Sequence, residues 1–197
     1  MKRLIFILFL VTLLMPLSLA IHSTSNDDYV YPEFAIQETM EEIIRVAKEG
    51  DIPDSDPLVQ RAKQLLRESK ERYLYDRDTI ATVVYNEAGY GCSDRHMELV
   101  AAVIYNRLKS DLFPDTVYEI VTAPKQYHPL YAEPDSKYGK MARNSNVWKK
   151  CKKIAEKALK GEINCPDEVY YQANFPQGSE IYEIHDTSYS RTWFCFE

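Results

Sequence analysis

The clearest pattern in the chain is a pair of helical repeats of apolar residues on either side of a glycine-bearing turn. In the first repeat, over residues 78–88, Asp78 suits the N-cap and Gly89 the end of the helix. Its apolar stripe consists of Ile80, Val83 and Val84. The second repeat begins after Ser93, a good N-cap. Its stripe consists of Met97, Val100, Ala101, Ile104 and Leu108. Two helices joined by a short turn are therefore expected over residues 78–108.

Three further helices are predicted from the same periodicity. Residues 35–49 and 58–74 each carry an apolar stripe, and a stretch with one glycine and two prolines separates them. They could form a helical hairpin packed on the rest of the chain, which we favour, or a separate recognition segment. A later helix, capped by Ser145 or Asn146, should end at Gly161.

The C-terminal part changes character and predicts strands. Three runs are rich in β-branched and aromatic residues, with turn signals between them: 168–175, 180–184 and 191–196. The expected fold class is therefore α+β, mainly α, with a small C-terminal antiparallel sheet. Residues 122–144 are polar and irregular, and long loops of this kind are usually functional or disordered. This loop also carries His128 and Tyr131, which suit the wall of a substrate groove.

Glu87 is the candidate catalytic residue. It lies in the last turn of the first predicted helix, between the two apolar stripes. The negative end of the helix dipole and burial by the turn both favour the neutral carboxyl group, so its pKa should be raised. A carboxylic acid that keeps its proton near neutral pH is what cleavage of a glycosidic bond requires. The plainer alternative is a solvated carboxylate at a helix end.

Four stretches resemble, in their order and spacing, the SleB-like family of cell wall hydrolases, which includes spore-cortex-lytic enzymes active around sporulation and germination. They are YNEAGYG around Glu87, MELVAAVIYNRLKSDLFPDTVYEIV at residues 97–121, and weaker pieces at 126–129 and 155–161. The likeness covers residues 78–196. It departs from the family at Lys125, because the family usually has a glycine at that position.

The resemblance implies a lysozyme-like helical domain of the goose-type or lytic transglycosylase kind. It also implies peptidoglycan glycan strands as the partner, the MurNAc–GlcNAc β-1,4 bond as the target, and neither cofactor nor metal. Lytic transglycosylases work with one carboxyl group. Glu87 would protonate the leaving oxygen and then accept the proton of the sugar's 6-hydroxyl group, which leaves a 1,6-anhydro-MurNAc end.

Five residues are candidates for contact with the glycan: Gln126, Tyr127, Tyr105, Asn106 and Tyr171. Gln126 and Tyr127 stand where related transglycosylases keep groove-lining polar and aromatic residues. The other two tyrosines could equally be packing residues with a solvated hydroxyl group. Asn106 is unfavourable inside a helix, so it should hydrogen-bond across the structure or to the substrate.

The first twenty residues, MKRLIFILFLVTLLMPLSLA, combine a basic start, an apolar run that is short for a membrane span, and small residues at positions 18 and 20. They predict a secretory signal peptide at residues 1–20. The mature protein would be secreted and cell wall-associated, with no membrane span after cleavage. An N-terminal segment with two helices, 21–75, and a hydrolase domain, 76–197, would follow.

The charge of the chain excludes one class of partner. It carries 24 basic and 30 acidic residues. Nucleic acid is not the expected partner, because phosphate binding needs a basic face. The same balance gives no general attraction to an anionic cell wall, so any wall binding must come from a local groove.

Four cysteines remain after the leader: Cys92, Cys151, Cys165 and Cys195. An even number in an exported chain favours two disulfides. Cys165 and Cys195 flank strand-like runs that could pair, which favours a Cys165–Cys195 bond and leaves Cys92 with Cys151. A zinc site is the alternative, but no C-x-x-C pair and no histidine at ligand spacing accompany these cysteines.

Three other functions stay open. A hydrolytic muramidase would need a second carboxylate, such as Asp94 or Glu98. An amidase that cuts the stem-peptide linkage would normally need zinc. A peptidoglycan-binding module without activity is the third, and the altered position Lys125 is its best support. Glu119 is not a catalytic candidate, because it has capping-box spacing with Thr116.

Overall fold

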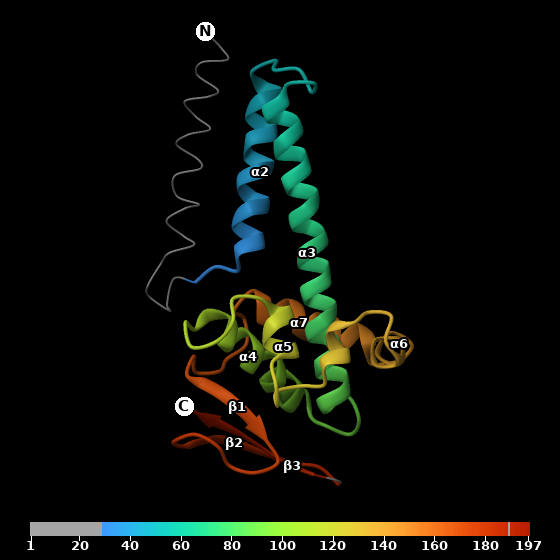
Figure 1. Ribbon diagram of the computed structural model, residues 1–197, viewed down its shortest axis with the longest axis vertical. Coiled ribbons are helices and arrows are strands. Elements are labelled where there is room, and N and C mark those ends of the chain that lie inside the picture. Colours follow the sequence, from blue (N-terminus) through green and yellow to red (C-terminus); the bar gives the residue numbers. More distant parts are fainter. Residues whose placement is uncertain (1–28, 189) are drawn as a thin grey trace. The chain divides into compact units, whose positions relative to one another are not determined.

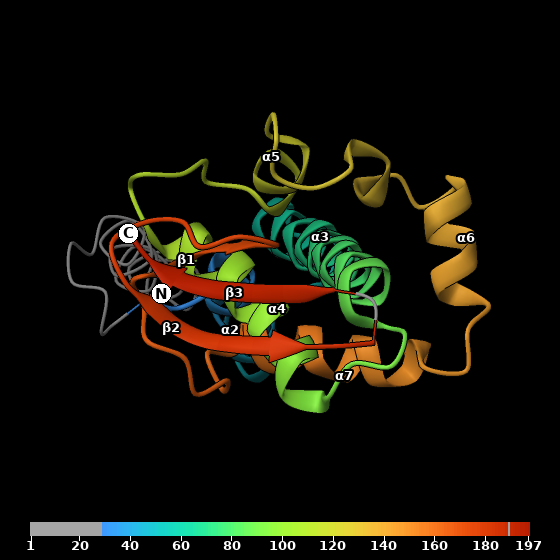
Figure 2. The same ribbon diagram turned by 90° about the horizontal axis from the view of Figure 1, so that it is seen from below.

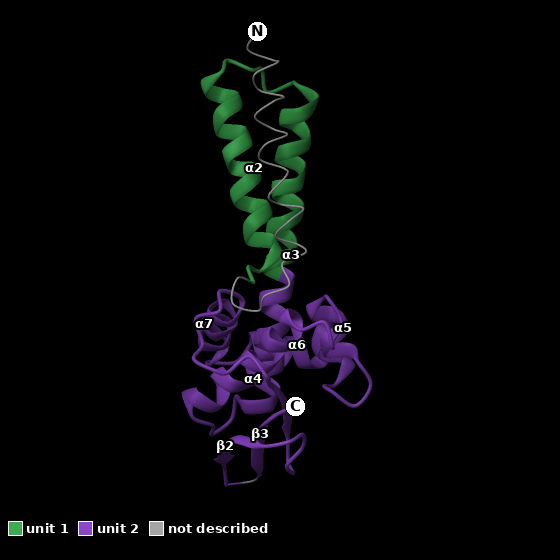
Figure 3. Ribbon diagram, turned by 90° about the vertical axis from the view of Figure 1, so that its left-hand side faces the viewer, with its two compact units in different colours: residues 1–74 green, residues 75–197 purple. Residues whose placement is uncertain are grey.

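The computed structural model describes residues 29–188 and 190–197, so the predicted signal peptide lies outside the described residues. The described part is mainly helical with a three-stranded antiparallel sheet, which confirms the expected α+β, mainly α class (Figure 1). The chain divides into two compact units, one ending at Leu74 and the other running from Tyr75 to Glu197 (Figure 3). The predicted roles of residues 21–75 and 76–197 stay predictions.

The first unit is a helical hairpin. Helix α2 (Pro32–Glu49) starts with a proline, whose missing N–H costs nothing in a first helical turn. It packs against the beginning of helix α3 (Pro57–Ala88) through a core of apolar side chains: Met40, Ile43, Ala47, Val59 and Ala62. The Ser69 hydroxyl group donates a hydrogen bond of 3.1 Å to the carbonyl oxygen of Glu33, which ties the two helices together again.

Helix α3 is continuous from Pro57 to Ala88, so the expected start of a separate helix at Asp78 is wrong. No glycine or proline interrupts residues 58–88. Asp78 forms an ion pair of 2.6 Å with Arg77 in the interior of the helix. The helix ends at Gly89, where a Cβ atom would lie 2.3 Å from the carbonyl oxygen of Tyr85. Only glycine permits this close approach, and it places Glu87 in the last turn.

Helix α4 (Asp94–Lys109) is the centre of the second unit. Ser93 caps it as predicted, because its hydroxyl oxygen accepts a hydrogen bond of 3.1 Å from the His96 N–H. Twelve of the sixteen residues of α4 are buried. The helix contacts α7, β1 and α5, so it holds the later elements of the chain together.

The elements after α4 are short helices. Helix α5 (Val117–Thr122) has the predicted cap, since Thr116 accepts a hydrogen bond from the Glu119 N–H at 3.2 Å. The segment expected to be irregular contains a 3-10 helix and a helix instead: η2 (Pro129–Ala132) and α6 (Lys137–Arg143). Helix α7 (Trp148–Leu159) starts after Val147, so the predicted caps Ser145 and Asn146 are wrong. The Ser145 hydroxyl group donates to the carbonyl oxygen of Ala142 at 2.7 Å.

The C-terminal sheet confirms the predicted strands: β1 (Val169–Ala173), β2 (Ile181–Asp186) and β3 (Arg191–Phe196). All pairings are antiparallel, and β3 lies between the other two strands (Figure 2). Strand β1 contacts α4, and Phe194 of β3 is fully buried. None of the helices in the described part of the chain is long and apolar enough to cross a membrane.

Candidate active site

Glu87 combines solvent access with a dense protein environment. Its side chain is exposed by surface area, yet desolvation by the surrounding protein raises the pKa of its carboxyl group. Both hold when a carboxyl group is open to water on one side and surrounded by protein on the others. A hydrogen bond from the Tyr131 hydroxyl group acts in the opposite direction on the same pKa, and desolvation is the larger effect. Glu87 is therefore reachable by a substrate and biased toward its protonated form.

Tyr131 belongs to a group of three aromatic rings beside Glu87. Its ring centroid lies 5.7 Å from that of His128 in a stacked arrangement, and 5.1 Å from that of Tyr138. The rings of His128 and Tyr138 are 4.6 Å apart. Aromatic faces pack against the C–H surface of sugars, so this group is suited to a sugar ring held next to the carboxyl group.

Tyr127 lies on the buried side of the same site. It is 7% exposed, and burial raises its pKa to about 12. The charges of Arg107 and Glu87 act on this pKa in opposite directions, which places Tyr127 near both groups. The Arg107 guanidinium group lies 5.7 Å from the Tyr127 ring centroid and donates to the carbonyl oxygen of Tyr170 at 2.8 Å. Tyr127 thus contributes to the packing beneath Glu87.

A cavity of about 440 Å³ adjoins the end of α3. Tyr85 and Gly89 line it, and both lie two residues from Glu87. The opposite wall comes from α6 and the loop that follows it: Lys140, Met141, Asn144, Ser145, Asn146 and Val147. The Tyr85 and Tyr90 hydroxyl groups hydrogen-bond to each other at its edge. The cavity presents amide, hydroxyl and ammonium groups to a ligand.

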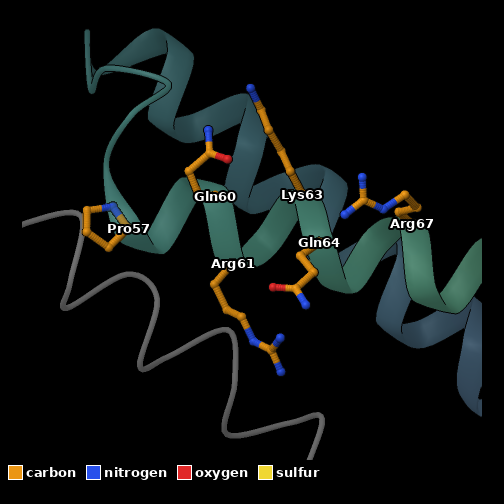
Figure 4. Close-up of a pocket in the computed structure, with 6 residues that line it drawn as sticks. All are labelled: Pro57, Gln60, Arg61, Lys63, Gln64 and Arg67. Carbon is orange, nitrogen blue, oxygen red and sulfur yellow. The ribbon is translucent and has the colours of Figure 1, made fainter.

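A second cavity, of about 610 Å³, lies on the first turns of α3 in the other unit (Figure 4). Its lining contains no carboxylate: Pro57, Gln60, Arg61, Lys63, Gln64 and Arg67. Neither cavity has a carboxylate in its lining. Glu87 is the candidate because desolvation raises the pKa of its accessible carboxyl group, and the cavity of about 440 Å³ is the one whose lining residues Tyr85 and Gly89 stand next to it in the chain.

The other acids considered from the sequence are held by partners. Asp94 forms an ion pair with Lys150. Glu98 forms one with Lys157 at 3.0 Å. The Thr116 hydroxyl group donates to the Glu119 carboxylate at 2.7 Å and accepts from the Glu119 N–H at 3.2 Å, so Glu119 is held at the helix cap.

The other predicted substrate contacts lie in different surroundings. Asn106 is buried and donates to the carbonyl oxygens of Pro166 and Val169, at 2.7 and 3.1 Å. The Tyr105 ring packs near Lys109, whose ammonium nitrogen lies 5.7 Å from the ring centroid.

Tyr171 is half-buried on β1, opposite Cys195 of β3, whereas Gln126 is exposed beside Tyr127. The geometry therefore brings Glu87 together with Tyr127 and Tyr131. The substrate contacts of Gln126, Tyr105, Asn106 and Tyr171 stay predictions.

Sequence reasoning did not select Tyr131 as the partner of Glu87. It placed Tyr131 in the groove wall only, because nothing in the spacing says which tyrosine of a loop meets which carboxylate. The recurrence of aromatic residues in an otherwise polar loop, at His128, Tyr131 and Tyr138, was the available signal.

Lys125 has a left-handed backbone, with φ of +65°. Residues other than glycine rarely adopt this backbone conformation, because their Cβ atom crowds the carbonyl oxygen. The turn before Gln126 therefore requires the left-handed region, and Lys125 adopts it under strain.

The described residues contain neither a disulfide bond nor a cluster of metal ligands. All four cysteines are free thiols here, with Cys151 and Cys195 buried. The predicted disulfides stay predictions. Within residues 29–188 and 190–197, no three histidine, cysteine, aspartate or glutamate side chains gather as metal ligands.

One comparison with known proteins is informative. A family model described as Cell Wall Hydrolase matches residues 91–191, about half of the chain. The match begins just after Glu87 and takes in α4, Tyr127, Tyr131 and the cavity wall at α6. No curated protein and no solved structure matches the chain, so the lysozyme-like architecture stays a prediction.

Proposed function

Because this chain belongs to the cell wall hydrolase family, whose members cleave peptidoglycan, we propose that it is a lytic transglycosylase with Glu87 as its single acid and base. The observation that carries this proposal is the state of Glu87. It is a solvent-accessible carboxyl group whose pKa is raised by desolvation, and it stands beside three aromatic rings.

The proposed reaction has two proton transfers at one carboxyl group. Protonated Glu87 gives its proton to the glycosidic oxygen as the bond to C1 of MurNAc breaks, which releases the 4-hydroxyl group of GlcNAc. The resulting carboxylate then takes the proton of the MurNAc 6-hydroxyl group while O6 bonds to C1. The product is a 1,6-anhydro ring, Glu87 is protonated again, and no water is consumed.

Tyr131 is suited to support the intermediate state of Glu87. The carboxylate formed after the first transfer needs a hydrogen-bond donor, and the Tyr131 hydroxyl group is in place to be one. Burial and the nearby Glu87 carboxylate raise the pKa of Tyr131, so its hydroxyl group keeps its proton.

The ion pairs of Asp94 and Glu98 support the single-carboxylate reaction over a hydrolytic muramidase. A general base that activates water must be free to accept a proton, whereas lysines of α7 hold both of these carboxylates. The signal peptide predicted at residues 1–20 supports export, since peptidoglycan lies outside the membrane.

The test is digestion of purified peptidoglycan, with mass analysis of the soluble products. We expect anhydro-muramyl ends from the native protein. Glu87→Gln should lower the rate by roughly 10²- to 10⁴-fold, the range for loss of a general acid. Glu98→Gln is the matched control and should retain activity. Reducing muramyl ends would indicate a muramidase and free stem peptides an amidase. No products from the native protein would favour a binding module.

A further inference from the structure

Residues 137–160 form α6, α7 and the loop between them (Figure 2). This stretch is strongly basic within an acidic chain. We name it the α6–α7 surface. Nine of these residues are lysine or arginine and only Glu156 is acidic, whereas the whole chain has 24 basic and 30 acidic residues. This stretch of the chain therefore carries a positive charge although the whole chain has an excess of acidic residues.

Most cations of the α6–α7 surface form no ion pair with an acid among residues 29–188 and 190–197. Helix α7 turns its apolar side chains inward and contacts α4 with them: Cys151, Ile154, Ala155, Ala158 and Leu159. Lys150 and Lys157 pair with acids of α4. In the described part of the chain, the remaining lysines of this surface have no ion pair with an acid: Lys137, Lys140, Lys149, Lys152, Lys153 and Lys160.

Helix α6 reaches the surroundings of Glu87 through Tyr138, whose ring centroid lies 5.1 Å from that of Tyr131, the hydrogen-bond partner of Glu87. Lys140 of the same helix lines the cavity that Tyr85 and Gly89 also line. Asn144 and Asn146 line it too, and their amide groups can hydrogen-bond to peptide groups. A ligand held here would therefore be an anion that also carries amide groups.

We propose that the α6–α7 surface binds the stem peptides of the strand being cleaved, through their carboxylates, with Lys140 as the contact nearest to the reaction. This rests on the proposed function, because it takes the glycan at Glu87 as given. Stem peptides branch from the MurNAc sugar whose bond is cleaved, so their carboxylates stay within reach of the cavity. A separate phosphate-rich wall polymer has no such tie to the cleavage site.

The test measures binding without turnover. The Glu87→Gln protein, with and without Lys140→Gln, Lys149→Gln and Lys153→Gln, is sedimented with two preparations of insoluble peptidoglycan, one untreated and one stripped of phosphate polymers. The matched control replaces three cations in the other unit, Lys48→Gln, Arg61→Gln and Arg67→Gln (Figure 4 shows the two arginines), and changes the net charge equally. A fourth protein carries arginine at the three α6–α7 positions. Thermal unfolding checks that each variant folds.

We expect the α6–α7 triple glutamine variant to bind about tenfold more weakly at low ionic strength, as loss of three surface ion pairs predicts, and the difference to vanish in high salt. The arginine variant should bind normally and the control within about twofold of the parent. Removing the stem peptides from the peptidoglycan should weaken binding of the parent protein and abolish the difference in binding between the parent and the α6–α7 triple glutamine variant.

Equal losses in both triple variants would overturn the proposal in favour of net charge. A loss seen only on untreated wall would overturn it in favour of a phosphate polymer. Because sedimentation requires no cleavage, a failure of the proposed chemistry would show in the digestion products and leave this binding result unchanged.

Discussion

Helix α4 and the segment 123–147, which runs from the end of α5 to the start of α7, are built in opposite ways. In α4 twelve of sixteen residues are buried. In the segment 123–147 only four residues are: Tyr127, Ala132, Gly139 and Ala142. The polar residues of α4 serve internal contacts, as the hydrogen bonds of Asn106 to Pro166 and Val169 illustrate. Most of those of the segment 123–147 are exposed or half-buried.

The difference indicates that α4 supports the fold of the second unit and that the segment 123–147 provides contacts to a ligand. A buried helix whose Asn106 amide and Arg107 guanidinium groups donate to backbone carbonyls fixes the second unit. An exposed segment with aromatic, amide and ammonium groups has little to lose in stability and much to offer a glycan. Substitutions in α4 should therefore lower stability, and substitutions in the segment 123–147 should change activity or binding.

The largest difference in the free energy of unfolding should come from replacing one asparagine by alanine in each of the two regions. Asn106→Ala leaves the carbonyl oxygens of Pro166 and Val169 without their donor inside the protein, so the free energy of unfolding should fall by roughly 2–4 kcal/mol. Asn144→Ala removes an exposed amide and should change it by less than about 0.5 kcal/mol. Denaturant unfolding measures both. Equal losses would mean that the two regions do not differ in this way.

A pH dependence should come from α4 as well. His96 is 2% exposed, and burial, with His185 nearby, lowers its pKa to about 4 from the ordinary value of 6.5. The unfolded chain binds the proton more tightly, so the contribution is complete above pH 6.5 and is lost as pH falls toward 4. Between pH 7 and pH 5 the loss should be roughly 2 kcal/mol.

The variant His96→Gln isolates the contribution of His96 to the pH dependence of stability, because it removes this titrating group and leaves the other ionisable residues in place. Denaturant unfolding at pH 7 and pH 5 should show a smaller pH-dependent loss for the variant than for the native protein. Parallel losses in the two proteins would assign the pH dependence to other groups.

Helix α4 was more predictable from the sequence than the segment 123–147. Helix α4, with its cap at Ser93, was predictable because a buried helix shows an apolar repeat and a local capping signal. The position of Glu87 at a helix end followed from that repeat and from Gly89. The Asp78 boundary failed, because a good capping residue does not start a helix where nothing stops the preceding one.

The segment 123–147 was less predictable. Helix α6 has only seven residues, too few to show a periodic stripe, and the pairing of Tyr131 with Glu87 depends on the tertiary structure. The cation-rich character of residues 137–160 was visible in the sequence, but its position beside the cavity was not.

An effect of intermediate size, on turnover, is expected when the hydroxyl group of Tyr131 is removed. Tyr131→Phe deletes the donor to the Glu87 carboxylate, so turnover should fall about tenfold. Without that donor the pKa of Glu87 rises further, the protonated acid persists to higher pH, and the alkaline limb of the rate profile should move upward. Tyr105→Phe in α4 is the control. It should leave the profile in place, and a shift there would support a substrate role for Tyr105.

The smallest effect concerns Lys125 and has the opposite sign from the others. Its left-handed backbone, with φ of +65°, costs a residue with a side chain about 1 kcal/mol or slightly more, so Lys125→Gly should raise the free energy of unfolding by up to about 1 kcal/mol. Lys160→Gly, at φ of −89°, is the matched control and should lower it. Digestion rates should not change with Lys125→Gly, because Lys125 lies in the turn and Glu87 keeps its partners. An unchanged rate would mean that this departure from the family is a backbone cost. A large rise in rate would instead mark Lys125 as a residue that suppresses activity, the outcome that a binding module derived from an enzyme requires.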